Sequence, residues 1–235
     1  MCHLDRQQLA SYNMRLTLFD LDGTLLPGDS DHAFGEFLLR LGWADAATYR
    51  QRNDEFFAQY QAGKLNIAAY VEFATQPWRD REPAEIDAAY AQFMAEFARP
   101  AVRAEALELV STHRQAGDLI AIVTATQEFI TRPIAELFEV HHLIATELLC
   151  DAEGRPTGAI RGTPAFREGK IVRVRQWLNT LGHAWGDFDR VTFYSDSTND
   201  LPLLEAVSHP VATNPSAALA DIANARQWPI LQLFT

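Results

Sequence analysis

Short runs of consecutive apolar residues alternate with longer stretches of helical periodicity along this chain. The runs lie at residues 16–19, 119–123, 142–145 and 191–194, with a shorter one at residues 210–212, and polar or turn-forming residues bound them. Uninterrupted apolar runs of this length are typical of strands that are buried on both faces of a parallel sheet. We therefore predict five parallel strands at these positions.

Between the runs, apolar residues recur at the spacing of amphipathic helices over residues 102–115, 128–138, 170–181 and 217–225. Strands and helices that alternate in this way predict a doubly wound α/β fold, in which helices cover both faces of a parallel sheet. Residues 148–160 contain an Asp-Ala-Glu-Gly turn and predict a small β-hairpin.

The strand pattern is absent between residues 31 and 99, where only helical periodicity occurs. Phe34, Phe37, Leu38 and Leu41, for example, show the spacing of one helix face. We therefore predict an inserted α-helical cap at residues 31–99, and an α/β core made of residues 15–30 and 100–235.

Composition narrows the class of protein. Of the 235 residues, 48% are hydrophobic and 22% are charged, and no stretch approaches the ~18 apolar residues of a membrane span. A net charge of −11 disfavours nucleic acid as a partner, since its phosphates attract clustered Lys and Arg. The two cysteines have no metal-ligand spacing. We expect a cytoplasmic monomer or homodimer that binds a small molecule and no membrane.

The carboxyl end of the first predicted strand carries two carboxylates. Asp20 follows the strand directly and Asp22 lies two residues on, so both can be aimed at one site. A carboxylate nucleophile with an adjacent proton carrier is the minimum for covalent phosphoryl transfer. Taken alone, the pair is more typical of an Asp-Gly turn.

The second strand and a later helix carry further candidates. Thr124, with the backbone N–H of Ala125, is placed to bind a phosphate oxygen at a helix N-terminus, although Thr124 or Thr126 would also serve as a helix cap. Lys170 follows a glycine at the start of a helix and would neutralise a carboxylate and the phosphoryl charge. Most lysines in such positions are instead solvated.

The strand at residues 191–194 leads into an acidic turn. Asp196, together with Asp20, would supply the hard oxygen ligands that Mg²⁺ prefers. Asn199 and Asp200 would hold ligating waters or Lys170. The structural alternative is an Asx-rich turn that caps the next helix.

These four elements resemble the motifs of the haloacid dehalogenase superfamily of Asp-based phosphatases. The motifs stand here as Asp20-Leu21-Asp22-Gly23-Thr24, Thr124, Lys170 and Asp196-Ser197-Thr198-Asn199-Asp200. The resemblance extends from about residue 15 to the C-terminus. It implies a Rossmann-like core, Mg²⁺ as cofactor, and hydrolysis of a phosphomonoester through an aspartyl-phosphate.

The resemblance also implies a role for each motif residue. Asp20 would be the nucleophile, Asp22 the general acid and then base, and Lys170 the group that stabilises Asp20. Thr124, Ala125 and Asn199 would lie on the phosphate side of the site. The Mg²⁺ site would be formed by Asp20, the Asp22 backbone, Asp196 as a direct ligand, and Asp200.

The helical insertion resembles the cap of the subgroup that contains phosphoserine phosphatases and bacterial histidinol-phosphate phosphatases. Asp29 stands where phosphoserine phosphatases place an acidic residue for the substrate amine, although it is also a loop residue ahead of a helix that Ser30 would cap. The segment Gly63-Lys64-Leu65-Asn66 resembles one that is followed by a carboxylate-binding arginine. Here residues 67–74 contain no arginine, although Arg79 and Arg81 in the polar turn beyond would be substitutes. In addition, Thr124-Ala125-Thr126 departs from the Ser-Gly-Gly of that group.

An amine-bearing phosphomonoester without a carboxylate fits these residues, and L-histidinol phosphate is our best prediction. The aromatic candidates for stacking on its imidazole are Phe34, Tyr70, Phe73 and Trp78. A phosphoserine phosphatase is the alternative within this class. A phosphorylation-dependent receiver-like signalling module is the alternative of another class, but Asp22 and a cap that excludes water favour turnover.

Overall fold

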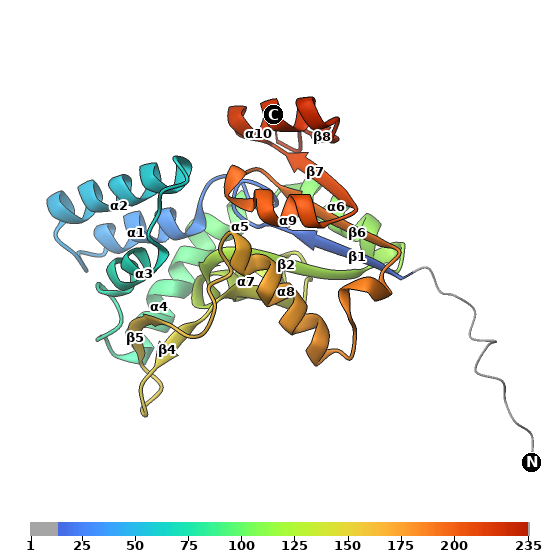
Figure 1. Cartoon of the computed structure of the whole chain (residues 1–235). Helices are drawn as coiled ribbons and strands as arrows, with labels where there is room; N and C mark the ends of the chain where they lie inside the picture. The colour runs from blue at the N-terminus through green and yellow to red at the C-terminus, as the bar shows by residue number, and fades with distance from the viewer. Residues whose placement is uncertain (1–13, 235) are drawn as a thin grey trace, which may run out of the picture.

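The computed structural model describes residues 14–234 and contains a six-stranded, fully parallel sheet (Figure 1). The strands lie in the order β3 (His142–Thr146), β2 (Leu119–Gln127), β1 (Arg15–Phe19), β6 (Arg190–Ser195), β7 (His209–Thr213) and β8 (Ile230–Leu231). The five predicted strands are confirmed. The prediction missed β8, because two residues are too short to form a pattern.

Helices cover both faces of the sheet, as the doubly wound fold requires. These are α6 (Ala104–Gln115), α7 (Glu128–Leu137), α8 (Glu168–Thr180), α9 (Leu201–Ala206) and α10 (Ala217–Arg226). Successive β1 residues face opposite layers. Phe19 shares an apolar cluster with Val110 of α6 and Ile134 of α7. Leu18 belongs to the cluster that contains Val174 of α8 and the buried residues of α9 and α10.

All the regular elements between residues 30 and 101 are helices, as the helical periodicity of residues 31–99 predicted. They are α1 (Ser30–Arg40), α2 (Ala46–Gln61), α3 (Ile67–Thr75), α4 (Pro83–Phe93), a π-helical turn (Met94–Ala98) and α5 (Arg99–Ala101). Asp29, Asp45 and Asn66 each accept a hydrogen bond from a backbone N–H three residues on, which starts α1, α2 and α3. These helices lie beyond the carboxyl end of β1 (Figure 1).

The inserted helices are not separate from the core. Phe34 of α1 and Phe93 of α4 are at most 2% exposed and belong to the same apolar cluster as Phe19 of the sheet. The predicted hairpin forms from β4 (Leu148–Cys150) and β5 (Pro156–Ile160) and lies against α3. A core of residues 15–30 and 100–235 with a cap of residues 31–99 stays a prediction. No helix within residues 14–234 is long and apolar enough to cross a bilayer.

Candidate functional site

The carboxyl ends of the three central strands bring the predicted polar residues together. β1 lies between β2 and β6, so Asp20 after β1, Thr124 on β2 and Asp196 after β6 meet at one edge of the sheet. The Asp20 N–H donates to the Tyr194 carbonyl at 2.9 Å, which continues the β1–β6 pairing up to this edge. Ligands bind at such an edge in open parallel sheets.

Lys170 is buried between two carboxylates and is not solvated. Its Nζ donates to Oδ1 of Asp20 at 2.9 Å and to Oδ2 of Asp200 at 2.7 Å, and Ser195 Oγ also donates to Asp200 at 2.8 Å. Burial alone would lower the pKa of Lys170, but Asp20 and Asp200 raise it. The lysine is therefore a fixed positive charge directly beneath Asp20.

Asp22 is held by two hydrogen bonds from different parts of the chain. Its Oδ1 accepts from the Ser30 N–H at 2.8 Å, and its Oδ2 accepts from Thr126 Oγ1 at 2.9 Å. Burial and then the charge of Asp29 raise the pKa of Asp22 to about 7. A carboxyl group with that pKa gives up and regains a proton at neutral pH.

Asp20 and Asp196 carry more negative charge than Lys170 neutralises. Burial raises the pKa of Asp20 to about 7 in spite of Lys170, and Asp200 adds to the rise. Burial, Asp20 and Asp200 raise the pKa of Asp196 well above its ordinary value. A cation beside Asp20 and Asp196 would reverse both shifts, because it favours the ionised forms.

The donor set at this edge fits Mg²⁺. Within residues 14–234, no three acidic, histidine or cysteine side chains converge to form a metal site by themselves. Mg²⁺ is commonly bound by one or two carboxylates with waters and substrate oxygens. Gly23 leaves room for Asp196, since a Cβ at residue 23 would lie 2.3 Å from Asp196 Oδ2.

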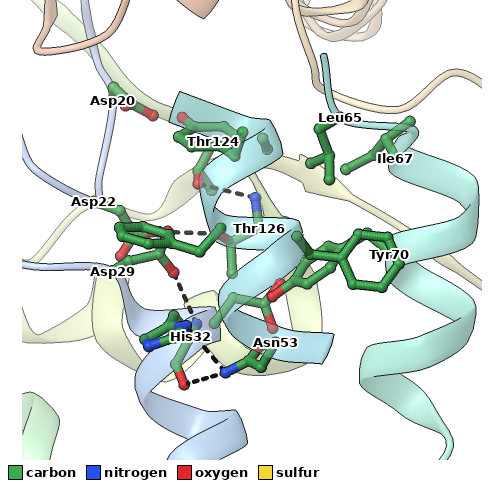
Figure 2. Close-up of a pocket in the computed structure, with 15 residues that line it drawn as sticks. Asp20, Asp22, Asp29, His32, Asn53, Leu65, Ile67, Tyr70, Thr124 and Thr126 are labelled. Atoms are coloured by element: carbon green, nitrogen blue, oxygen red, sulfur yellow. Dashed lines mark hydrogen bonds between the residues drawn. The ribbon is translucent and has the colours of Figure 1, made fainter. Parts of the chain in front are cut away.

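A pocket lies between this edge of the sheet and the inserted helices (Figure 2). Its lining residues are Asp20, Asp22, Asp29, Asp31, His32, Asn53, Phe56, Phe57, Tyr60, Leu65, Ile67, Tyr70, Thr124, Ala125 and Thr126. Four of these side chains are carboxylates and none is a lysine or an arginine. The pocket therefore suits a ligand with positive charge beyond its phosphate.

Only some of the residues predicted to bind the phosphate line the pocket. Thr124 and Ala125 line the pocket. Neither Thr124 nor Thr126 caps α7, whose N-cap is Gln127. Asn199 does not line the pocket, because its side chain donates to the Tyr60 carbonyl at 2.9 Å and so contacts α2.

Asp29 is both a pocket residue and the N-cap of α1. Its Oδ1 accepts from the His32 N–H at 2.8 Å, and its backbone is extended, with φ −121° and ψ 115°. Ser30 is the first helical residue, so the alternative in which Ser30 caps α1 is wrong. Asp200 pairs with Lys170, which puts its carboxylate behind the lysine.

Of the four aromatic residues expected to stack on a ligand, Tyr70 lines the pocket. Phe34 and Trp78 are buried in the apolar cluster of the core, and Phe73 stacks on Tyr49 at a centroid distance of 4.4 Å. Sequence reasoning did not single out as ligand contacts the lining residues Asp31, His32, Asn53, Phe56, Phe57, Tyr60, Leu65 and Ile67. Four of them recur at helical spacing on one face of α2, and that spacing was the available signal.

Comparison with known proteins gives consistent matches. Residues 17–205 match the family described as haloacid dehalogenase-like hydrolase. The chain is 41% identical over 216 residues to a histidinol-phosphatase of Neisseria meningitidis serogroup C (strain 8013), which covers 92% of this chain and 97% of that protein.

Two solved structures share the fold. A Bordetella pertussis Tohama I protein of unknown function superposes with a TM-score of 0.89 at 50% identity and covers 94% of this chain and 100% of its own. A substrate-bound phosphoserine phosphatase superposes with a TM-score of 0.67 at 16% identity, covering 93% and 92%. At that identity the phosphoserine phosphatase supports the fold alone.

Proposed function

The chain belongs to the haloacid dehalogenase-like hydrolase family, and we propose that it is a Mg²⁺-dependent phosphomonoesterase whose substrate is L-histidinol phosphate. The 41% identity to a histidinol-phosphatase over nearly the whole of both chains supports this substrate. The observation that carries the proposal is the lining of the pocket. Four carboxylates and no lysine or arginine line it.

The charge of the pocket separates histidinol phosphate from phosphoserine. Both substrates carry an ammonium group, but phosphoserine also carries a carboxylate. A carboxylate that enters this pocket would lose its hydration without gaining a cationic partner, and it would meet Asp29 and Asp31. Arg79 is no substitute, since it lies at the β5 hairpin, where it donates to the Thr157 carbonyl.

The geometry supports a two-step reaction. In the first step, a carboxylate oxygen of Asp20 attacks phosphorus, and the ester oxygen leaves with the proton of Asp22. In the second step, Asp22 takes a proton from water, whose oxygen attacks phosphorus, so that phosphate leaves and the Asp20 carboxylate is restored. Lys170 favours the ionised form of Asp20 and aligns its carboxylate. Thr124 Oγ1 and the Ala125 N–H would bind the phosphoryl oxygens.

Asp20, Asp196 and the backbone carbonyl of Asp22 would hold Mg²⁺. Their fit rests on the excess of buried carboxylates and on the space that Gly23 leaves beside Asp196. When bound, Mg²⁺ would neutralise phosphoryl charge and help to orient the substrate phosphate.

A Gly23→Ala substitution tests this placement of the metal. Gly23 has a φ of +74°, and a Cβ there would displace Asp196. We expect the Mg²⁺ concentration for half-maximal activity to rise by about tenfold or more, as for the loss of a ligand-orienting contact. The matched control is Gly42→Ala, with a φ of +69° and nothing within 4 Å of the added Cβ. A normal Mg²⁺ requirement in Gly23→Ala would contradict the placement.

An Asp29→Asn substitution tests ammonium recognition. Asparagine also caps helices well, so α1 is preserved while the negative charge is lost. We expect kcat/KM for histidinol phosphate to fall by about 10- to 100-fold, as for other charge-assisted hydrogen bonds, with little change for p-nitrophenyl phosphate. Asp45→Asn changes the exposed cap of α2 in the same way and serves as the control. Equal losses on both substrates would assign Asp29 to helix capping instead.

The proposed function is tested by phosphate release from a panel of substrates with Mg²⁺ or with EDTA. The panel contains histidinol phosphate, phosphoethanolamine, phosphoserine, glycerol phosphate and a lysophosphatidate. We expect Mg²⁺-dependent turnover with the highest kcat/KM for histidinol phosphate. Absence of turnover on every substrate, with stable phosphorylation of Asp20, would support the signalling alternative instead.

A further inference from the structure

Asp31, another of the four carboxylates in the pocket, differs from Asp29 in its hydrogen-bond partners. Asp29 accepts a backbone hydrogen bond at the start of α1. Asp31 lies in the first turn of α1 and lines the pocket, yet its side chain has no cationic or backbone partner within residues 14–234. Tyr70 and Gln127 are the neutral polar side chains that interact with it. Burial and the charges of Asp29 and Asp22 raise the pKa of Asp31 well above its ordinary value. Asp31 therefore offers a carboxyl group whose ionised form a bound cation would stabilise.

Gln127 beside Asp31 is also incompletely bonded. It is 1% exposed, and neither its side-chain nitrogen nor its oxygen has a hydrogen-bond partner of normal length among the described residues. Buried amides are rarely left in that state, because the lost hydration is costly. Gln127 is not a lining residue of the pocket, so it is the Asp31 carboxyl that would meet a ligand there, with Gln127 as its neighbour.

The pocket wall near Asp31 contains aromatic side chains, which suit a planar, aromatic ligand group. Phe56, Phe57 and Tyr70 line the same pocket from α2 and α3, and the ring of His32 lies 5.0 Å from that of Phe57. Asn53 Nδ2 donates to His32 Nδ1 at 3.0 Å and so fixes the histidine ring (Figure 2). A planar ligand in this pocket would lie among aromatic side chains and near the Asp31 carboxyl.

The four carboxylates of the pocket come from successive positions along the chain, from the sheet edge into the first turn of α1. Asp20 and Asp22 belong to the sheet edge, Asp29 to the junction with α1, and Asp31 to the first turn of α1. In Figure 2, Asp20 lies at one end of the labelled residues, and His32 and Asn53 at the other. A substrate whose phosphate contacts Asp20 would therefore present its far end to the first turn of α1.

We propose that Asp31, with Tyr70 beside it in the pocket wall, forms the subsite that binds the nitrogen heterocycle of the substrate, an imidazole or imidazolium N–H donating to the carboxylate. Asp29 then binds the ammonium group alone. The inference rests on the proposed function and deepens it, because it assigns the two nitrogen groups of one substrate to two carboxylates.

Asp31→Asn tests the subsite through the ratio of two substrates. Histidinol phosphate carries both nitrogen groups, whereas phosphoethanolamine carries only the ammonium. We expect kcat/KM for histidinol phosphate to fall by about 10- to 100-fold, mostly through KM, and phosphoethanolamine to change by less than about twofold. Asp29→Asn is the matched control and should lower both. Equal loss on both substrates in Asp31→Asn would overturn the proposal.

Thermal unfolding of the ligand-free protein distinguishes binding from a structural role. An aspartate in the first turn also stabilises a helix through its dipole. If that were the role of Asp31, the Asn variant would lower Tm by about 2–4 °C and leave the substrate ratio unchanged. We expect Tm to stay the same or rise, since an unpaired buried carboxyl is removed. Tyr70→Phe provides a second variant and should shift the same ratio in the same direction, by a smaller factor.

Inhibition by L-histidinol separates this inference from the proposed substrate. It is measured against p-nitrophenyl phosphate in the wild type and in Asp31→Asn. If histidinol phosphate is not turned over but the inhibition constant of histidinol rises about tenfold or more in Asp31→Asn, the substrate is wrong and the subsite is supported. An inhibition constant that does not depend on Asp31 would overturn the subsite.

Discussion

Asp20→Asn should abolish turnover, with kcat lower by ~10⁴-fold or more on every phosphomonoester. The amide cannot act as the nucleophile, although its shape preserves the contact with Lys170, which keeps its 2.7 Å pairing with Asp200. The measurement is phosphate release, together with acid-quench trapping of phosphorylated protein, which should be absent in this variant.

The control for this variant is Asp80→Asn, which makes the same chemical change on a side chain that is 89% exposed. It should retain full activity. Substantial turnover by a verified, folded Asp20→Asn preparation would remove Asp20 as the nucleophile. Since Asp20 is also a proposed metal ligand, trapping of the intermediate in the wild type is needed to separate nucleophile from ligand.

Asp22→Asn should lower kcat by about 10²–10⁴-fold, the usual contribution of general acid–base catalysis, with little change in phosphate binding. Its effect should depend on the leaving group. An alkyl ester needs a proton from Asp22 in the first step, whereas p-nitrophenolate leaves without one. With p-nitrophenyl phosphate, the variant should therefore release a burst of nitrophenol and then turn over slowly, because the second step still lacks its base.

A substitution that keeps the Asp22 carboxylate but removes one of its hydrogen bonds serves as the control. Thr126→Val removes the hydroxyl that donates to Asp22 at 2.9 Å but leaves the carboxylate in place. It should raise the pKa seen in the pH–rate profile, since a hydrogen bond to the ionised form is lost. Equal effects of Asp22→Asn on alkyl and nitrophenyl esters, without a burst, would exclude Asp22 as the proton carrier.

The fold could be predicted because its signal is local. The predicted strands of the main sheet are apolar runs, and β1, β2, β3, β6 and β7 were found for that reason, while β8 has only Ile230 and Leu231. The motif residues were found together because the carboxyl ends of parallel strands meet at one edge. Lys170 illustrates the limit of local reasoning. Nothing in its neighbourhood along the chain distinguishes a solvated lysine from one buried between Asp20 and Asp200.

The residues of the pocket wall were harder to predict, because tertiary packing determines which side chains of each helix face the pocket. Phe34 and Tyr70 have the same chemical character, but α1 turns Phe34 toward the core and α3 turns Tyr70 toward the pocket. Asp29 and Ser30 are both good helix caps, and the extended backbone at Asp29 decided between them. Asp31 looks in the sequence like an ordinary acidic residue in a first helical turn, and its place in the pocket wall without a cationic partner is visible only in three dimensions.

A competition experiment tests the central claim most directly. Equal concentrations of histidinol phosphate and phosphoserine are mixed with the wild-type enzyme and Mg²⁺, and free histidinol and free serine are quantified at early times. Their ratio gives the relative kcat/KM without any difference in enzyme preparation. A pocket lined by four carboxylates and no lysine or arginine predicts at least about 100-fold preference for histidinol phosphate. Equal or preferred hydrolysis of phosphoserine would contradict the account.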